Sequence, residues 1–133
     1  MLKIIESTAT IPAQDIKRAR QFYEQKLGLT PGEVQQDGSV EYRTGSTGFL
    51  VFPSMGKASG DHTQLGLDVE DVVSATKELK SKGVKIEDYD FPEFKTNDGI
   101  ADLADGSKGA WFKDTEGNLI ALAQRVPATT RAR

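Results

Sequence analysis

Apolar and polar residues follow two patterns along this chain, one typical of strands and one typical of helices. Residues 2–11 are rich in β-branched side chains, which predicts a strand ended by Pro12. Within residues 16–27 apolar side chains recur every three or four positions, the spacing of an amphipathic helix. Asp15 stands where an N-cap belongs, and Gly28 where a helix ends. Turn residues then separate three predicted strands, at 32–36, 39–43 and 48–52.

The same order of elements returns in the second half of the chain. Residues 54–61 are small and polar, which is typical of a linker. Asp71 is expected to cap a second helix that ends at Gly83, and Gly117-Asn118 to form a turn. The strands predicted in this half are 62–69, 84–87, 109–113 and 119–124.

This repetition extends to the residues themselves. TIPAQDIKRARQFYEQKLGL aligns with GLDVEDVVSATKELKSKGV, and Asp15 and Asp71 are then 56 positions apart. RTGSTGFLVF aligns with KDTEGNLIAL at an offset of 70, from Arg43 to Lys113, which leaves 14 extra residues within 89–106. The duplication predicts an α+β fold, with two tandem βαβββ modules forming a curved mixed sheet around a cleft.

The chain also resembles the vicinal oxygen chelate superfamily, which includes glyoxalase I, bleomycin-resistance proteins and extradiol dioxygenases. The similarity spans residues 4–125. The residues that carry it are Ile11-Pro12, Asp15, Phe22-Tyr23, Leu27-Gly28-Leu29 and WFKDTEGNLIAL at 111–122. We therefore expect a single domain over 1–125, with module one at 1–53, the linker at 54–61, module two at 62–125 and a flexible tail at 126–133. The resemblance also implies a homodimer.

Metal ligands in that superfamily occupy four inward positions, which correspond here to Thr8, Val51, Gln64 and Ala121. Valine and alanine have no lone pair to donate, and a metal ion needs about three protein donors. We therefore predict no metal and no other cofactor, and interpret these residues as walls of a ligand cleft.

Other residues are expected to face the same cleft. Side chains two positions apart on a strand share a face. This alternation adds Phe49, His62 and Leu119. The geometry of the superfamily implies that Trp111 also points inward, which makes Glu41 its counterpart in module one and turns Tyr42 toward the helix.

Glu41 and His62 are the candidate catalytic residues. A carboxylate beside aromatic side chains can acquire a raised pKa and act as a general base, and a histidine can do the same or pair with it. Glu41 equally suits a solvated position on an edge strand, and His62 suits a solvated position beside the linker better than a catalytic one.

The extra segment of module two has its own character. Residues 87–105 contain seven acidic side chains and one basic side chain, Lys95, and Phe91 and Phe94 flank Pro92. These two aromatic residues suit a lid over a ligand, and the acidic charge would favour a cationic one. The other interpretation is a solvated loop whose phenylalanines pack at the domain edge.

Composition narrows the possible functions. The 133 residues include no cysteine and one histidine, which excludes a disulfide scaffold, a thiolate metal site and a site of two histidines and a carboxylate from one chain. A net charge of −3 argues against nucleic acid as a partner. No apolar run suits a membrane span or a signal peptide, so we expect a cytoplasmic protein with no membrane partner.

Three functions remain. The first is a metal-free protein that sequesters a small hydrophobic or aromatic ligand in the cleft, rather than an enzyme. The second is a metal-independent lyase or isomerase that uses Glu41 or His62 as its base. The third is a metal-dependent lyase or dioxygenase of the glyoxalase type.

Overall fold

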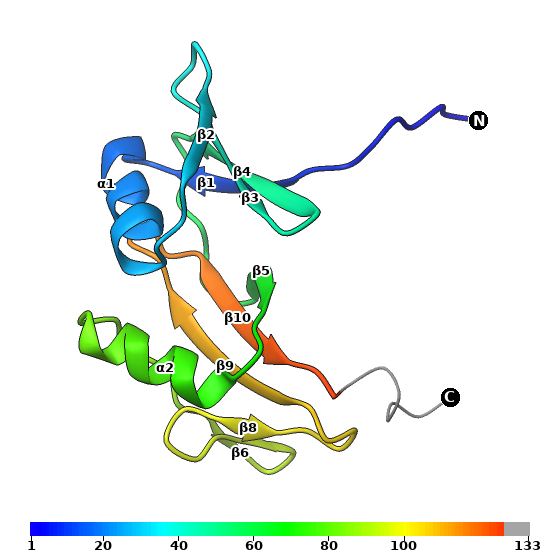
Figure 1. Ribbon diagram of the computed structural model, residues 1–133, viewed down its shortest axis with the longest axis vertical. Helices are drawn as coiled ribbons and strands as arrows, with labels where there is room; N and C mark the ends of the chain where they lie inside the picture. The colour runs from blue at the N-terminus through cyan, green and yellow to red at the C-terminus, as the bar shows by residue number, and fades with distance from the viewer. Residues whose placement is uncertain (127–133) are drawn as a thin grey trace. The chain divides into compact units, whose positions relative to one another are not determined.

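The computed structural model describes residues 1–126 (Figure 1). These residues divide into two compact units. Unit 1 comprises Met1–Ser59 together with the turn Asp114–Asn118. Unit 2 comprises Gly60–Lys113 and, within the described part, residues 119–126. Most of the tail expected at 126–133 lies outside the described residues.

Unit 1 contains one βαβββ module. Its elements are β1 (Ala9–Ala13), α1 (Ile16–Gln21), the π-helical turn η1 (Phe22–Lys26), β2 (Pro31–Val34), β3 (Val40–Thr44) and β4 (Thr47–Pro53). The strands form a sheet in the order β1-β4-β3-β2, in which β1 runs parallel to β4 and the other neighbours are antiparallel.

Unit 2 repeats this architecture. Its elements are β5 (Thr63–Asp68), α2 (Val72–Ser81), β6 (Asp90–Phe91), β7 (Phe94–Lys95), β8 (Ala101–Asp102), β9 (Lys108–Lys113) and β10 (Leu119–Gln124). The sheet order β5-β10-β9-β8 matches that of unit 1, with β5 parallel to β10. The predicted α+β fold of two βαβββ modules is therefore confirmed, and its strands form two four-stranded sheets.

Both helices begin as the sequence predicts. The Asp15 carboxylate accepts a hydrogen bond from the amide of Arg18, and the Asp71 carboxylate accepts from the amides of Val73 and Ser74. These bonds satisfy amide groups that have no partner within the first turn of a helix. In unit 1 the predicted single helix changes from α to π after Gln21.

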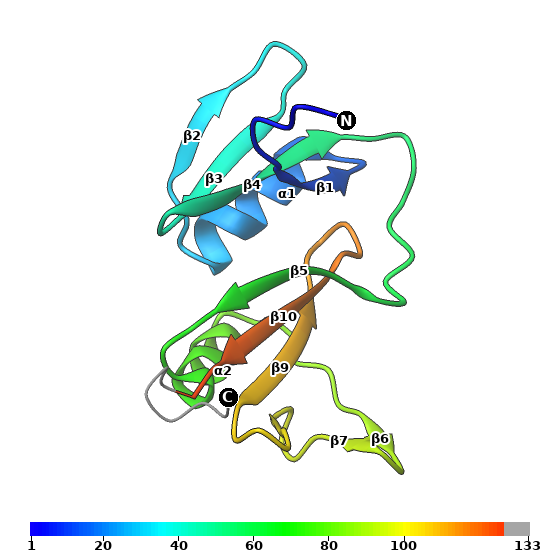
Figure 2. The same ribbon diagram turned by 90° about the vertical axis from the view of Figure 1, so that its right-hand side faces the viewer.

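Each helix covers one face of its own sheet, as Figure 2 shows for each unit separately. In unit 1 the rings of Tyr23, Tyr42 and Phe49 lie between helix and sheet, with centroids 5.5–5.6 Å apart, and all three side chains are buried. In unit 2 Phe112 and Ile120 occupy the corresponding covered face. The opposite face of each sheet is called its open face below.

The turn Asp114–Asn118 completes the core of unit 1. The hydroxyl of Tyr23 donates a hydrogen bond to Asp114, with 2.5 Å between the two oxygens. Burial first, and the Asp114 charge second, raise the pKa of Tyr23 far above its usual value. Glu116 is buried and accepts hydrogen bonds from the side chain of Arg18 and from the amide of Asp15. The turn between β9 and β10 is thus bonded to the start of α1.

Three predicted segments differ from the observed structure. Residues 2–8 of the predicted strand 2–11 lie outside any strand, since β1 begins at Ala9. The predicted strand 84–87 is reduced to one bridge between Ile86 and Phe112. The segment 89–106, expected to be a loop, contains the short strands β6, β7 and β8. No helix within residues 1–126 has the length and apolar character needed to cross a bilayer.

Candidate ligand-binding site

The open face of unit 1 is largely apolar. Because Ile11, Tyr42, Phe49 and Val51 are buried, the alternate positions of their strands lie on the other face. Those positions are Thr10, Pro12, Glu41, Leu50 and Phe52, and all except the exposed Thr10 are half-buried. The expectation that Phe49 and Val51 face a cleft is therefore wrong, because Leu50 and Phe52 take that orientation.

This error comes from the length of one turn. Tyr42 and Phe112 are equivalent buried residues 70 positions apart, as expected. The turn Asp114–Asn118 is one residue longer than Thr44–Thr47, so the offset becomes 71 on the next strand. A shift of one residue moves every side chain of a strand to the opposite face. An offset of 70 carried through the turn thus selects Val51 instead of Leu50.

The open face of unit 2 contains a groove. It lies along β9 and β10 and has a volume of about 250 Å³. Gly109, Ala121 and Ala123 contribute little or no side chain, so they form a shallow floor beside the indole of Trp111. Trp111 is paired with Ala121 across the two strands. The side chains of these two residues therefore lie on the same face of the sheet.

Trp111 is held by contacts on several sides. Its Nε1 donates a hydrogen bond to the hydroxyl of Thr63 on β5, at 3.3 Å. Tyr89 and Phe94 pack edge-on against the indole, with ring centroids 5.8 and 5.1 Å away. A Cβ atom on Gly109 would lie only 3.0 Å from the indole Cη2, so glycine leaves the space that the ring occupies. The indole is therefore positioned before any ligand arrives.

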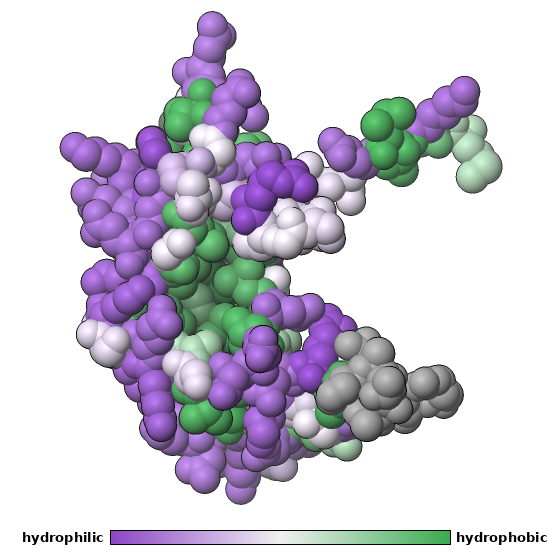
Figure 3. All heavy atoms as spheres, viewed as in Figure 1, coloured by the Kyte–Doolittle hydropathy of each residue, from purple (hydrophilic) through white to green (hydrophobic). Residues whose placement is uncertain are grey.

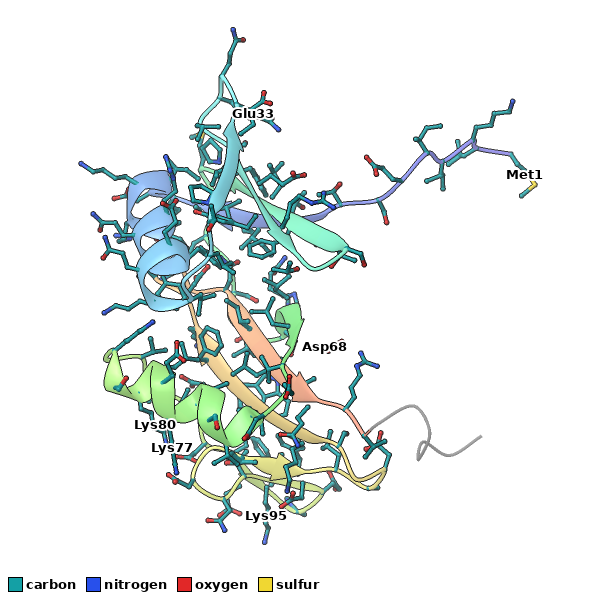
Figure 4. All side chains as sticks on the ribbon, viewed as in Figure 1. Met1, Glu33, Asp68, Lys77, Lys80 and Lys95 are labelled. Atoms are coloured by element: carbon teal, nitrogen blue, oxygen red, sulfur yellow. The ribbon has the colours of Figure 1, made fainter. Side chains whose placement is uncertain are left out.

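Charged side chains border this groove. Lys108, Arg125 and Asp105 line it along with Leu103 and Val126. Each of the two basic residues also contacts a carboxylate that is not part of the lining. Lys108 is paired with Asp102, and Arg125 is paired with Asp68 at the end of β5. Figure 4 labels Asp68. The carboxylate of Asp105 accepts hydrogen bonds from the amide and hydroxyl of Ser107, which lower its pKa.

Phe91 and Phe94 do not behave as a pair. Phe94 is half-buried against Trp111, whereas Phe91 is 55% exposed and stacks on Tyr89. Tyr89 links the two and had no part in the sequence-based site. No regular spacing of apolar residues predicts the position of Tyr89, because Tyr89 follows a predicted strand that is reduced to one bridge.

The acidic charge of this segment is partly neutralised. Asp98 pairs with Lys80 of α2 at 3.0 Å, Asp102 pairs with Lys108, and the closest Asp90–Lys95 distance is 3.9 Å. Two of these three lysines lie outside residues 87–105, so counting charges along the sequence overstates the local negative charge.

The remaining candidates are scattered. Glu41 is half-buried on the open face of unit 1, opposite Leu50. His62 and Thr8 are exposed and lie outside strands. Gln64 is half-buried on β5, next to an irregularity in the pairing with β10. Leu119 is buried at the first position of β10.

Comparison with known proteins identifies the family. Residues 5–122 match the Glyoxalase/Bleomycin resistance protein/Dioxygenase superfamily, and the chain belongs to this superfamily. No curated protein matches the chain.

Solved structures share the fold at low sequence identity. The fosfomycin resistance protein FosX from Listeria monocytogenes has a TM-score of 0.71 and 11% identity, over 99% of this chain and 100% of that one. A lactoylglutathione lyase from Agrobacterium tumefaciens has a TM-score of 0.67 and 15% identity, over 90% and 93%. TnmS3, an antibiotic binding protein from Streptomyces sp. CB03234, has a TM-score of 0.63 and 19% identity, over 94% and 100%.

The residues present do not fit the metal site that such a fold can carry. With the corrected register, the positions on β4 and β10 hold Leu50 and Ala121, neither of which has a donor atom. Thr8 and Gln64 supply only neutral oxygen donors. Within residues 1–126, no three side chains among histidine, aspartate and glutamate come together as a metal-binding group.

Proposed function

We propose that this chain is a metal-free binding protein that holds a flat aromatic or hydrophobic molecule against Trp111. The observation that carries the proposal is the groove of unit 2, where one fixed indole borders a floor of glycine and alanine. Small-molecule sites are concave and mostly apolar, with few polar groups. A ring over Gly109 and Ala121 would bury apolar area, which contributes about 25 cal/mol per Å². Its contact with the indole would add about 0.5–1.5 kcal/mol.

One similar structure supports a binding role. TnmS3 is an antibiotic binding protein. We infer that the present chain likewise holds a small organic molecule. Catalysis by Glu41 or His62 is less well supported, because no side chain within residues 1–126 orients either one, whereas a catalytic base is held by its neighbours.

The proposed ligand can carry a positive charge. The segment 87–105 keeps an acidic excess, and Asp105 lies in the lining of the groove. Lys108 and Arg125 oppose this preference from the same lining. The aromatic ring is therefore the main determinant of binding in this proposal, and the charge is secondary.

Intrinsic fluorescence tests the proposal directly. Trp111 is the only tryptophan of the chain, so a ring that stacks in the groove should quench its emission. Proflavine and anthraquinone-2-sulfonate, two planar three-ring probes of opposite charge, should quench with saturation, and calorimetry should give the same dissociation constant. Saturable quenching by neither probe would refute the site.

A pair of matched variants locates the bound probe. Ala123→Leu fills the groove floor and should weaken binding at least tenfold while leaving Trp111 in place. Ala104→Leu adds the same atoms at an exposed position outside the lining and should have no effect. Equal affinities for the two variants would show that the probe binds elsewhere.

A homodimer is also part of this proposal, as expected from the superfamily.

A further inference from the structure

The first eight residues include four large apolar side chains that pack against nothing in unit 1. In this N-terminal arm, residues 1–8, every side chain is exposed. Met1, Leu2, Ile4 and Ile5 are 73–123% exposed, and no hydrogen bond or ion pair of residues 1–7 occurs within the described chain. Figure 1 shows the arm running away from β1, and Figure 3 shows hydrophobic residues of the arm in green. Figure 4 labels Met1 at its far end.

A cluster of exposed apolar side chains marks a surface that another molecule covers. The arm leads directly into β1, which lies at the end of its sheet, so one edge of that strand has no neighbour in the sheet. The arm is also rich in residues that favour strands. It therefore has the composition and position of a strand that lacks its partner strand.

The arm is complementary to a second copy of itself. Lys3 is its only basic side chain and Glu6 its only acidic side chain. In an antiparallel pair, one register places Lys3 opposite Glu6 of the partner subunit, and the same register places Ile4 opposite Ile5 of the partner subunit. Two-fold symmetry then forms each contact twice. Opposite charges and β-branched residues that face each other across strands stabilise such a pair.

We propose that two copies of this chain associate through antiparallel pairing of their N-terminal arms in this register. The inference rests on the proposed homodimer and names the segment that forms it. Because each arm continues into β1, which is bonded to β4, the paired arms extend two existing sheets and do not form an isolated hairpin.

Light scattering and sedimentation of the full chain test the association. The wild-type chain should be a dimer, and Ile4→Asp with Ile5→Asp should raise the dimer dissociation constant at least a hundredfold. Met55→Asp is the matched control, because Met55 is 98% exposed in the linker, and it should remain dimeric. Circular dichroism checks that all three chains are folded. A monomeric wild type refutes the homodimer itself, whereas a dimeric arm variant refutes only the role of the arm.

Charge exchange and cross-linking test the register. Lys3→Glu or Glu6→Lys alone should weaken the dimer several-fold, and the two together should restore it. The natural chain has no cysteine, so Leu2→Cys and Ser7→Cys can be introduced in separate chains. Mild oxidation should cross-link a mixture of the two variants and neither one alone. Failure of the double charge variant to recover, or equal cross-linking of one variant with itself, would contradict the register.

Discussion

The two units share one architecture and use their aromatic residues in opposite ways. In unit 1 Tyr23, Tyr42 and Phe49 are enclosed beneath the helix, and the open face carries Glu41 at the position equivalent to Trp111. In unit 2 the covered face has a single aromatic ring on its central strands, that of Phe112. Two further rings, those of Tyr89 and Phe94, pack against the half-exposed Trp111.

This difference separates stability from binding. An aromatic ring beneath a helix stabilises the fold because it removes apolar area from water, and truncating that ring leaves a cavity. A ring on an open face contributes little to folding but can contact a ligand. Equivalent positions on the two open faces also differ in side-chain size. The large Leu50 and Phe52 of unit 1 correspond to the small Ala121 and Ala123 of unit 2. The groove exists because unit 2 has the small residues there.

Truncating one ring in each unit should give the largest contrast. Phe49→Ala removes a buried ring, so the free energy of unfolding should fall by about 3–5 kcal/mol. Trp111→Ala should lower it by about 1 kcal/mol, because the indole is partly exposed, yet should abolish probe binding. Urea unfolding followed by circular dichroism, with calorimetry for binding, measures both effects. Equal losses of stability would show that the two rings have the same role.

The buried turn in unit 1 should make stability depend on pH. Burial alone would raise the pKa of Glu116, but the hydrogen bonds from Arg18 and from the Asp15 amide outweigh it, and the pKa falls below the usual value of 4.5. A lowered pKa in the folded chain means that stabilisation is complete above pH 4.5. It is lost as the pH falls through the lower, folded-state value.

Glu116→Gln removes this ionisation while keeping the shape of the side chain. At pH 7 the variant should be less stable by about 2 kcal/mol, which is the loss expected for charged hydrogen bonds. The difference from the natural chain should narrow as the pH falls below 4.5. Urea unfolding at several pH values between 3 and 7 measures it. A gap that stays constant with pH would mean that Glu116 is not charged in the folded chain.

The fold could be predicted from the sequence because helix caps and apolar spacing act locally. Asp15 and Asp71 start their helices as predicted, and the repeat places the strands in order. The site was harder to predict, because one additional residue in the turn Asp114–Asn118 reverses the faces of an entire strand. The ion pairs of Lys80 and Lys108 join segments that are separated in sequence, so no local sequence pattern predicts them.

Crowding the indole should weaken binding without emptying the groove. In Gly109→Ala the new methyl group would lie 3.0 Å from the Trp111 ring, so the ring must shift. We expect a five- to tenfold loss of probe affinity, which corresponds to about 1 kcal/mol, and a change in the fluorescence maximum. Gly66→Ala is the control, because its methyl group would meet no atom within 4 Å. Binding that is unaffected by Gly109→Ala would show that the position of the indole does not matter.

Charge should have the smallest effect. Because lysines neutralise Asp98 and Asp102, and because Lys108 and Arg125 line the groove themselves, the acidic segment can attract a cation only weakly. Raising the salt concentration from about 50 to 300 mM should change the affinity ratio of proflavine to anthraquinone-2-sulfonate by about twofold, since the screening length falls from about 14 to about 6 Å. Asp105→Asn should move the ratio in the same direction by a similar factor, because it removes the one carboxylate in the lining. A tenfold change in either experiment would mean that charge, and not the Trp111 indole and the small-residue floor, selects the ligand.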